Sequence, residues 1–281
     1  MKNKGLLYIV STPIGNLEDI TLRALRILGE VSLIAAEDTR RTRKLLSAYD
    51  ITCPLTSLYN QNEPQKSSYI ITRILEGDSV AYVSDAGTPG ISDPGYVLIN
   101  QAIAHDIPVV PIPGPSAAVA ALSASGLPMD SFVFFGFLPS RKGKRMRLLQ
   151  SLEYESKTMV FYESPRRLLS TLQEMKEHFG NRSIAVAREL TKIHEEIIRG
   201  TIGELITSSM QRKIKGEVTI VVSGSGDSLP AADHTLIEDR VTQLQKERNI
   251  STRDMIDIIS KESGMSRKDV YHIVLSHLRE K

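Results

Sequence analysis

The chain has 281 residues, 41% of them apolar and 24% charged, which is ordinary for a soluble globular protein and long enough for two domains. Its formal net charge of +2 is too small to indicate a polyanion partner, so any nucleic-acid surface must come from local clustering of charge. Cys53 is the only cysteine, which excludes an intramolecular disulfide and a cysteine-rich metal site.

The N-terminal apolar run, residues 6–10, is too short for a signal peptide or a membrane span. No other stretch approaches spanning length, and the histidines show no metal-ligand spacing. We therefore expect a cytoplasmic protein with no membrane segment and no metal.

The first part of the chain alternates short apolar runs with amphipathic segments. The pattern predicts strands over residues 6–10, 31–36, 79–84 and 107–112. Helices are predicted from about residue 19 to 29, over 39–49 and over 64–76. Because the strand runs are continuously apolar, they are typical of a parallel sheet that is buried between two helix layers.

A second strand and helix alternation follows the Ala/Ser-rich segment 116–127. Strands are predicted over 131–137, 158–162, 184–187 and 218–222, with a very basic loop after the first and a helix that ends near Phe179. Domain boundaries are expected near residues 127 and 226, which divides the chain into α/β domains over 1–126 and 127–225 and a helical module over 226–281. That module contains two capping-box patterns, Ser251-x-x-Asp254 and Ser266-x-x-Asp269, and resembles a helix-turn-helix unit.

Small residues and prolines follow three of the predicted strands. The segments are Ser11–Asn16, Asp85–Gly95 and Pro113–Ala117. Any one of them could be a tight turn and nothing more. In an open parallel sheet, however, ligands bind beyond the carboxyl ends of the strands, so three such segments together favour a ligand cleft.

The type of ligand follows from what these turns lack. No P-loop is present, and no G-x-G-x-x-G follows the first strand. Proline-rich turns with few free N–H groups make a poor pyrophosphate cradle but suit a ligand held by shape and apolar contact. S-adenosylmethionine, which has no phosphate, is such a ligand.

The motifs STPIGN, AEDTRRT, SDAGTPGISDPG, IPGPSA, FYESPRR and VARELTK, in this order and spacing, resemble those of the tetrapyrrole-methylase-type (class III) methyltransferases. The resemblance covers about residues 5–224 and implies a homodimer of chains with a parallel-sheet N-terminal domain, a mixed-sheet second domain and the cofactor between them. Carried over residue by residue, it implies that the cofactor contacts are Pro13, Asp85, Gly87, Thr88, Pro89, Ile91, Ser92, Ser116, Ala117, Tyr162, Arg188 and Val218.

Within the family, the motifs and the helical tail look like the branch that methylates the ribose 2′-hydroxyl of a cytidine in small-subunit (16S) ribosomal RNA. Local charge supports an RNA partner, although a solvated helix face is the usual interpretation of one basic run alone. Two runs are present, and together they favour phosphate contacts from Arg40, Arg41, Arg43, Arg141, Lys142, Lys144 and Arg145.

Methyl transfer to a hydroxyl depends mainly on alignment, and a general base adds to it. The carboxylates near predicted strand ends are Glu37, Asp38, Glu163 and Glu189, each of which could equally be structural. Two other functions stay open. One is C-methylation of a tetrapyrrole or corrinoid on the same fold, against which the basic loop and helical tail argue. The other is a ribosome-binding protein without catalysis, against which the intact motifs argue.

Overall fold

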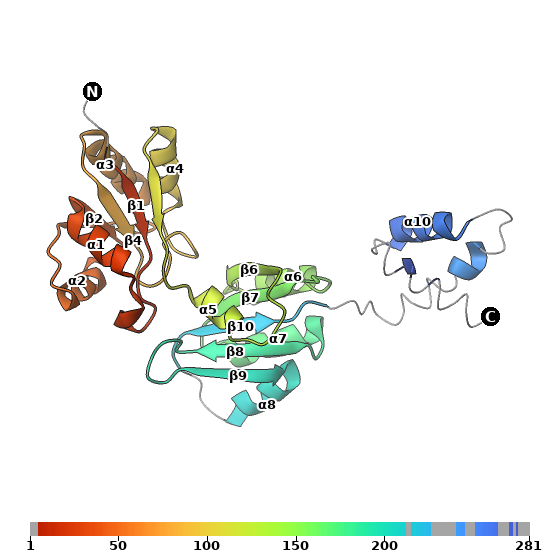
Figure 1. Ribbon diagram of the computed structural model, residues 1–281. Helices are drawn as coiled ribbons and strands as arrows, with labels where there is room; N and C mark the ends of the chain where they lie inside the picture. Colours follow the sequence, from red (N-terminus) through yellow and green to blue (C-terminus); the bar gives the residue numbers. More distant parts are fainter. Residues whose placement is uncertain are drawn as a thin grey trace.

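The computed structural model describes residues 5–211, 215–225, 240–244, 251–263, 270–271 and 274 of the chain. Two five-stranded sheets dominate it, one formed by the first part of the chain and one by the second (Figure 1). The predicted α/β class with two sheet-containing domains is therefore confirmed.

The first sheet is parallel throughout, with the strand order β3-β2-β4-β1-β5. Along β4, Val80 and Tyr82 pack into the core on one face of the sheet, whereas Ala81 and Val83 pack into the core on the other. All four side chains are fully buried, as the continuous apolar runs predict. The strands are β1 (Leu7–Val10), β2 (Leu33–Ala36), β3 (Leu55–Ser57), β4 (Val80–Val83) and β5 (Val109–Ile112).

Helices cover both faces of this sheet. The core on one face includes residues of α1 (Leu22–Glu30) and α2 (Thr39–Ala48), and the core on the other includes residues of α3 (Glu63–Leu75) and α4 (Tyr96–Ala104). A short 3-10 helix, Leu17–Asp19, precedes α1. The sequence pattern does not predict α4, because its residues are apolar nearly all round and so show no helical period.

The second sheet is mixed, with the order β6-β7-β10-β8-β9. Strands β6 and β7 are parallel, and the other neighbours are antiparallel. The strands are β6 (Phe132–Phe137), β7 (Thr158–Glu163), β8 (Ser183–Arg188), β9 (Glu196–Thr201) and β10 (Val218–Val222). The mixed sheet implied by the family resemblance is thus confirmed. Strand β9 is not predicted from the sequence, because its apolar residues Ile197 and Ile198 are flanked by charged residues.

One face of the second sheet is covered by α6 (Lys142–Ser151), α7 (Leu168–Phe179) and α8 (Ile202–Gln211), whose apolar residues share a core with the sheet. The prediction of a basic loop after β6 is wrong, because the segment forms α6. Lys, Arg, Met and Leu are all good helix formers, and the buried Leu149 anchors the helix to this core.

The opposite face of the second sheet is covered by α5 (Ala117–Ser123). Its Ala118, Ala121 and Leu122 pack against Val160 of β7 and Val221 of β10, and Figure 1 shows the helix beside β10. The predicted boundary at residue 127 assigns α5 to the first domain, but its packing places it with the second sheet.

Few residues of the predicted helical module are described. Helix α10 (Thr252–Ser263) begins as the first capping-box pattern predicts, since the amide N of Asp254 donates to Ser251 Oγ at 3.1 Å. Its apolar face belongs to a separate small core that includes Val241, Leu244 and Val270. The second pattern, residues 266–269, lies outside the described residues. None of the described helices combines the length and the hydropathy that a membrane crossing requires.

Candidate active site

The loops that follow β1, β4 and β5 meet at the carboxyl edge of the first sheet, as the sequence predicts. Thr12 and Gly87 form an antiparallel bridge, in which each amide N donates to the other's carbonyl O at 2.9 and 3.0 Å. The Oγ1 atom of Thr88 lies 3.0 Å from Ser11 Oγ and 3.4 Å from the carbonyl O of Pro115. These hydrogen bonds join all three loops into one wall.

The β4 loop is held at its far end by two buried side chains. The hydroxyl of Tyr82 donates to the carbonyl O of Pro94 at 2.8 Å. The Glu63 carboxylate accepts hydrogen bonds from the amide N atoms of Gly95 and Val97, both at 2.9 Å, at the start of α4. A carboxylate at a helix N-terminus is electrostatically favourable, so the loop is fixed before any ligand arrives.

A cavity of about 410 Å³ lies between these loops and the second sheet. Its volume is within the range of ligand pockets, roughly 300–1,000 Å³. The first part of the chain supplies Ile14 and residues of the β4 loop, and the second supplies Tyr162, Leu190 and the segment 216–219. The site therefore exists only where both sheets come together.

Most residues predicted to contact the cofactor line this cavity, namely Asp85, Gly87, Thr88, Ile91, Ser92, Ser116, Ala117, Tyr162 and Val218. Pro13, Pro89 and Arg188 are not part of the lining. The Nε atom of Arg188 donates instead to Glu196 on the neighbouring strand at 2.6 Å. The two prolines adjoin the lining residues Ile14 and Thr88.

Glu37, a predicted catalytic carboxylate, lines the cavity directly after β2. Its Oε2 atom accepts a hydrogen bond of 3.3 Å from the amide N of Asp85. Burial raises the pKa of Glu37, and the nearby negative charge of Asp85 acts in the same direction. The position therefore favours proton uptake more than an exposed glutamate would.

The carboxyl of Asp93, which the sequence did not single out, has a pKa that is shifted further than that of Glu37. It lines the same cavity, and burial together with the charge of Glu37 raises its pKa to about 6, although a hydrogen bond with Ser84 acts in the opposite direction. Its place in the long β4 loop was visible from the sequence. The raised pKa depends on how the folded chain buries this carboxyl and places Glu37 near it, and no local pattern reveals that.

Two other predicted catalytic carboxylates lie outside the cavity lining and have structural partners. Asp38 caps α2 and accepts from Arg40 Nε at 3.0 Å, and Arg40 holds the pKa of this carboxyl well below its usual range. Glu189 accepts from Lys192 Nζ at 2.9 Å and from the amide N of Glu217 at 3.0 Å, and the bond from Lys192 lowers its pKa.

Glu163, the remaining predicted catalytic residue, lines the cavity but is 2% exposed. Its Oε1 atom accepts from Arg167 Nε at 2.8 Å and from the amide N of Ser164 at 2.6 Å, while Thr171 Oγ1 donates to Oε2 at 2.7 Å. Because both oxygens are satisfied by the protein, this geometry is that of a residue that holds β7 and α7 together.

The predicted RNA contacts occupy different environments. Arg40 and Arg43 are exposed on α2, while Arg41 lines the cavity with one Nη atom 3.4 Å from Asp85. Arg141, Lys142 and Lys144 are exposed where α6 begins.

Arg145 requires a correction. Its side chain is 6% exposed and forms a two-pronged ion pair with Glu174 of α7, with N–O distances of 2.6 and 2.8 Å. It also donates to the carbonyl oxygens of Pro139 and Ser140. A guanidinium with these partners inside the protein is not presented to phosphate, so the expectation that Arg145 contacts RNA does not fit its position.

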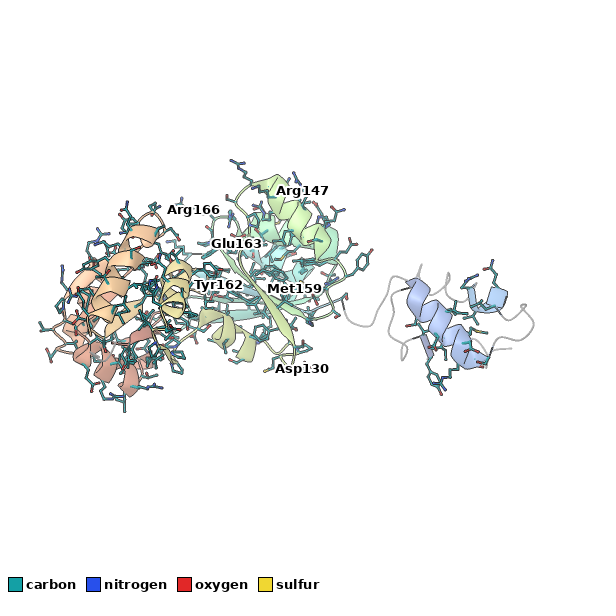
Figure 2. All side chains as sticks on the ribbon, turned by 90° about the horizontal axis from the view of Figure 1, so that it is seen from above. Asp130, Arg147, Met159, Tyr162, Glu163 and Arg166 are labelled. Carbon is teal, nitrogen blue, oxygen red and sulfur yellow. The ribbon has the colours of Figure 1, made fainter. Side chains whose placement is uncertain are left out.

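The structure brings one further cation to the site. Figure 2 shows β7 running from Met159 toward the first domain, with Tyr162 and Glu163 near its end and Arg166 beyond them. Arg166 is exposed and follows the lining residues Ser164 and Pro165 directly. The FYESPRR motif contains it, but its sequence alone does not distinguish it from Arg167, which is bound to Glu163.

The charges around the cavity define the class of ligand. Among the described residues that line it, the carboxylates are Glu37, Asp85, Asp93, Glu163 and Glu217, and Arg41 is the only Lys or Arg. An acidic lining attracts a cation and repels phosphate. Two α/β domains that share such a cavity are therefore suited to bind a cationic ligand without phosphate.

The comparison with known families agrees. The chain belongs to the tetrapyrrole (corrin/porphyrin) methylase family, whose model matches residues 6–206. Proteins of this family are S-adenosylmethionine-dependent methyltransferases, and the acidic lining fits the sulfonium of that cofactor. Gly87, with φ of +82°, leaves the lining open where a side chain would otherwise project.

Curated relatives resemble most of the chain. A protein of Halalkalibacterium halodurans named ribosomal RNA small subunit methyltransferase I is 43% identical over 274 residues, which covers 96% of this chain and 95% of the relative. One of Thermotoga maritima with the same name is 51% identical over 220 residues, or 78% of this chain and 99% of that one.

Solved structures are similar in fold. Uroporphyrin-III C-methyltransferase of Thermus thermophilus has a TM-score of 0.57 at 21% identity, and the match covers 79% of this chain and 96% of that one. Diphthine synthase has a TM-score of 0.59 at 13% identity, with 78% and 90% covered. At these identities the likeness shows the shared fold alone.

Proposed function

We propose that this protein transfers the methyl group of S-adenosylmethionine to the ribose 2′-hydroxyl of a cytidine in small-subunit (16S) ribosomal RNA. The name shared by relatives that are 41–51% identical is the observation that carries the RNA substrate. The hydroxyl acceptor and the cytidine are supported by the resemblance of the six ordered motifs to one branch of the family.

Exposed cations beside the cavity support an RNA substrate. Arg141, Lys142 and Lys144 are exposed at the N-terminus of α6, and no acidic residue lies in the first turn. Positive charge at a helix N-terminus is unfavourable by about 0.3–1 kcal/mol per group, because the helix dipole has the same sign there. A phosphate bound nearby would interact favourably with both the side chains and the dipole.

For this reaction the protein must align the ribose hydroxyl with the methyl group of the cofactor and accept a proton. The bound cofactor supplies a methyl group on a positively charged sulfur. The 2′-oxygen forms the new O–CH₃ bond as the S–CH₃ bond breaks, and the hydroxyl proton must leave. Asp93 is the proposed acceptor of that proton, because a carboxyl with a pKa of about 6 is ionised at neutral pH and more basic than an ordinary aspartate. Glu37 stands beside it as the second carboxylate with a raised pKa.

Quaternary structure and location belong to the same proposal. The family resemblance implies a homodimer, and the large apolar side chains of Tyr96 and Ile103 on α4 are 76% and 60% exposed in the single chain. Sedimentation equilibrium of the full chain tests for the dimer. A monomer at micromolar concentration would contradict the proposed quaternary structure. A cytoplasmic location follows from the ribosomal substrate.

One experiment tests the function. Purified protein is incubated with radiolabelled S-adenosylmethionine and small ribosomal subunits from cells that lack the gene, and the RNA is digested to nucleosides. A parallel reaction contains a tetrapyrrole as the acceptor in place of the subunits. Label in 2′-O-methylcytidine is expected. Label that enters a porphyrinoid and not RNA would replace the proposal with C-methylation, and label in neither would indicate a binding protein without catalysis.

A further inference from the structure

Strand β6 contains a bulge that changes the direction of its last side chain. Phe134 pairs with Val160 of β7, but the next paired residue is Gly136, opposite Phe161. Phe135 is therefore the extra residue. A bulge shifts the alternation of side chains by one position, so residues after it exchange faces.

The consequence is visible in the aromatic contacts. Phe135 packs into the core below the sheet and stacks on Phe161, with ring centroids 5.1 Å apart and an angle of 14°. Phe137 lies two residues further along and in a regular strand would join that core. Because of the bulge it pairs with Tyr162 and lines the cavity on the opposite face.

Phe137 is held in place but left uncovered. Its ring makes an edge-to-face contact with Tyr162 at a centroid distance of 5.4 Å and an angle of 61°, and Phe134 contacts Tyr162 in the same manner at 5.0 Å and 70°. Even so, Phe137 is 61% exposed. Many proteins expose single apolar residues, but this one lies at the lining of the cofactor cavity and is oriented there by a backbone irregularity.

We propose that the ring of Phe137 is a stacking platform for the base of the nucleotide that receives the methyl group. The inference rests on the proposed function and deepens it by assigning the base-binding position. A ribose that reaches the cavity must bring its base out of the RNA stack, and an unstacked base is commonly bound on an aromatic ring.

The neighbouring residues fit a nucleotide in this position. The chain leaves Phe137 through Leu138–Ser140 and reaches the exposed cations Arg141 and Lys142, which lie where phosphates that flank the nucleotide would pass. Arg166 is exposed on the neighbouring loop after β7. An aromatic surface beside cations is the usual combination for binding single-stranded RNA.

The first test is Phe137→Ala in the full-length protein, with Phe132→Ala as the matched control. Phe132 is an exposed phenylalanine at the other end of the same strand and is not part of the cavity lining. Loss of one stacked base should raise the KM for small ribosomal subunits about 5- to 150-fold, with kcat much less affected. Phe137→Tyr should restore it, and calorimetry should show a change in the affinity for S-adenosylmethionine that is much smaller than the change in KM.

The second test uses the fact that the chain has no tryptophan. Phe137→Trp introduces a single tryptophan at the platform, which can be excited selectively over the tyrosines, and a short oligocytidine should quench it while S-adenosylhomocysteine does not. Phe132→Trp should not respond to either compound.

Three results would overturn the proposal. They are an unchanged KM in Phe137→Ala, quenching of Phe137→Trp by S-adenosylhomocysteine alone, and no quenching by oligocytidine at concentrations that saturate binding to the wild-type chain. The second result would assign the ring to the cofactor. Failure of the proposed function is distinguishable, because in that case the wild-type protein itself transfers no methyl group to RNA.

Discussion

The Oγ atom of Ser92, in the loop after β4, lies 2.6 Å from the position that a Cβ atom would occupy on Gly136 of β6. Gly136 has φ of +64°, in the left-handed region that favours glycine, and it belongs to the bulge that orients Phe137. The contact joins the loop that carries Asp93 to the strand that carries Phe137. The two walls of the cavity thus touch at a residue without a side chain.

Gly136→Ala should therefore weaken both folding and cofactor binding. The backbone conformation costs an alanine about 1–2 kcal/mol, and the added methyl displaces the hydroxyl of Ser92, a residue that lines the cavity. Denaturant unfolding and calorimetry with S-adenosylmethionine measure the two effects. Gly143→Ala on α6 is the control, since a Cβ there meets nothing within 4 Å, and it should leave cofactor affinity unchanged. Equal behaviour of the two variants would contradict the assigned role of Gly136.

Arg145 should matter for stability and not for RNA. Replacing one partner of a buried ion pair leaves the other charge unpaired, so Arg145→Met should lower the free energy of unfolding by about 3–5 kcal/mol. The double variant Arg145→Met/Glu174→Leu should recover much of that loss, because both charges are gone. Urea unfolding checks the order of stability. If the double variant folded normally but lost RNA affinity, Arg145 would be an RNA contact as the sequence predicted.

The exposed cations of α6 should show the reverse behaviour. Lys142→Ala and Lys144→Ala should leave unfolding nearly unchanged and weaken RNA binding. If each residue contacts one phosphate, the slope of log affinity against log salt should fall by about 0.7 per residue removed. Filter binding at several salt concentrations measures it. Lys157, which is exposed directly before the first residue of β7, provides the control substitution. If Lys157→Ala lowered the slope equally, the effect would come from the overall charge of the protein and not from a local RNA site.

The pH dependence of methyl transfer should report Asp93. Its pKa of about 6 means that the carboxyl is mostly ionised at pH 7 and becomes protonated as the pH falls through 6. Since the protonated form cannot accept the hydroxyl proton, kcat/KM should decline below pH 6. Asp93→Asn should lower kcat/KM by about 10²–10⁴-fold and remove this decline.

Glu37→Gln serves as the companion measurement. Glu37 raises the pKa of Asp93 through its charge, so its removal should move the acidic limb of the profile to lower pH. Asp38→Asn should leave the limb in place, because Asp38 is outside the cavity lining and bound to Arg40. An acidic limb that persists in Asp93→Asn would mean that another group accepts the proton.

Local patterns in the sequence were sufficient for much of the fold. The continuous apolar runs predict β1, β2, β4 and β5, because such runs are typical of parallel strands between helix layers. The expected burial holds for β1, β2 and β4, whereas β5 lies at the sheet edge and its Pro111 is exposed. Strands β3 and β9 contain few apolar residues next to polar ones and lack a continuous apolar run. They are strands because a neighbour pairs with them, as β8 does with β9.

The sequence alone also determined that three glycine- and proline-rich loops meet at one sheet edge, since parallel strands bring their carboxyl ends together. It further determined that the motifs in these loops resemble those of a methylase. Only the tertiary structure decided which residues of those loops function. The pKa of Asp93 depends on burial and on the charge of Glu37, Arg145 is withdrawn from solvent in its ion pair with Glu174, and Phe137 reaches the cavity through a bulge defined by the pairing of its strand with β7. Each of these depends on a partner distant in the chain, and burial, charge pairing and strand register are properties of the folded arrangement and not of any short segment.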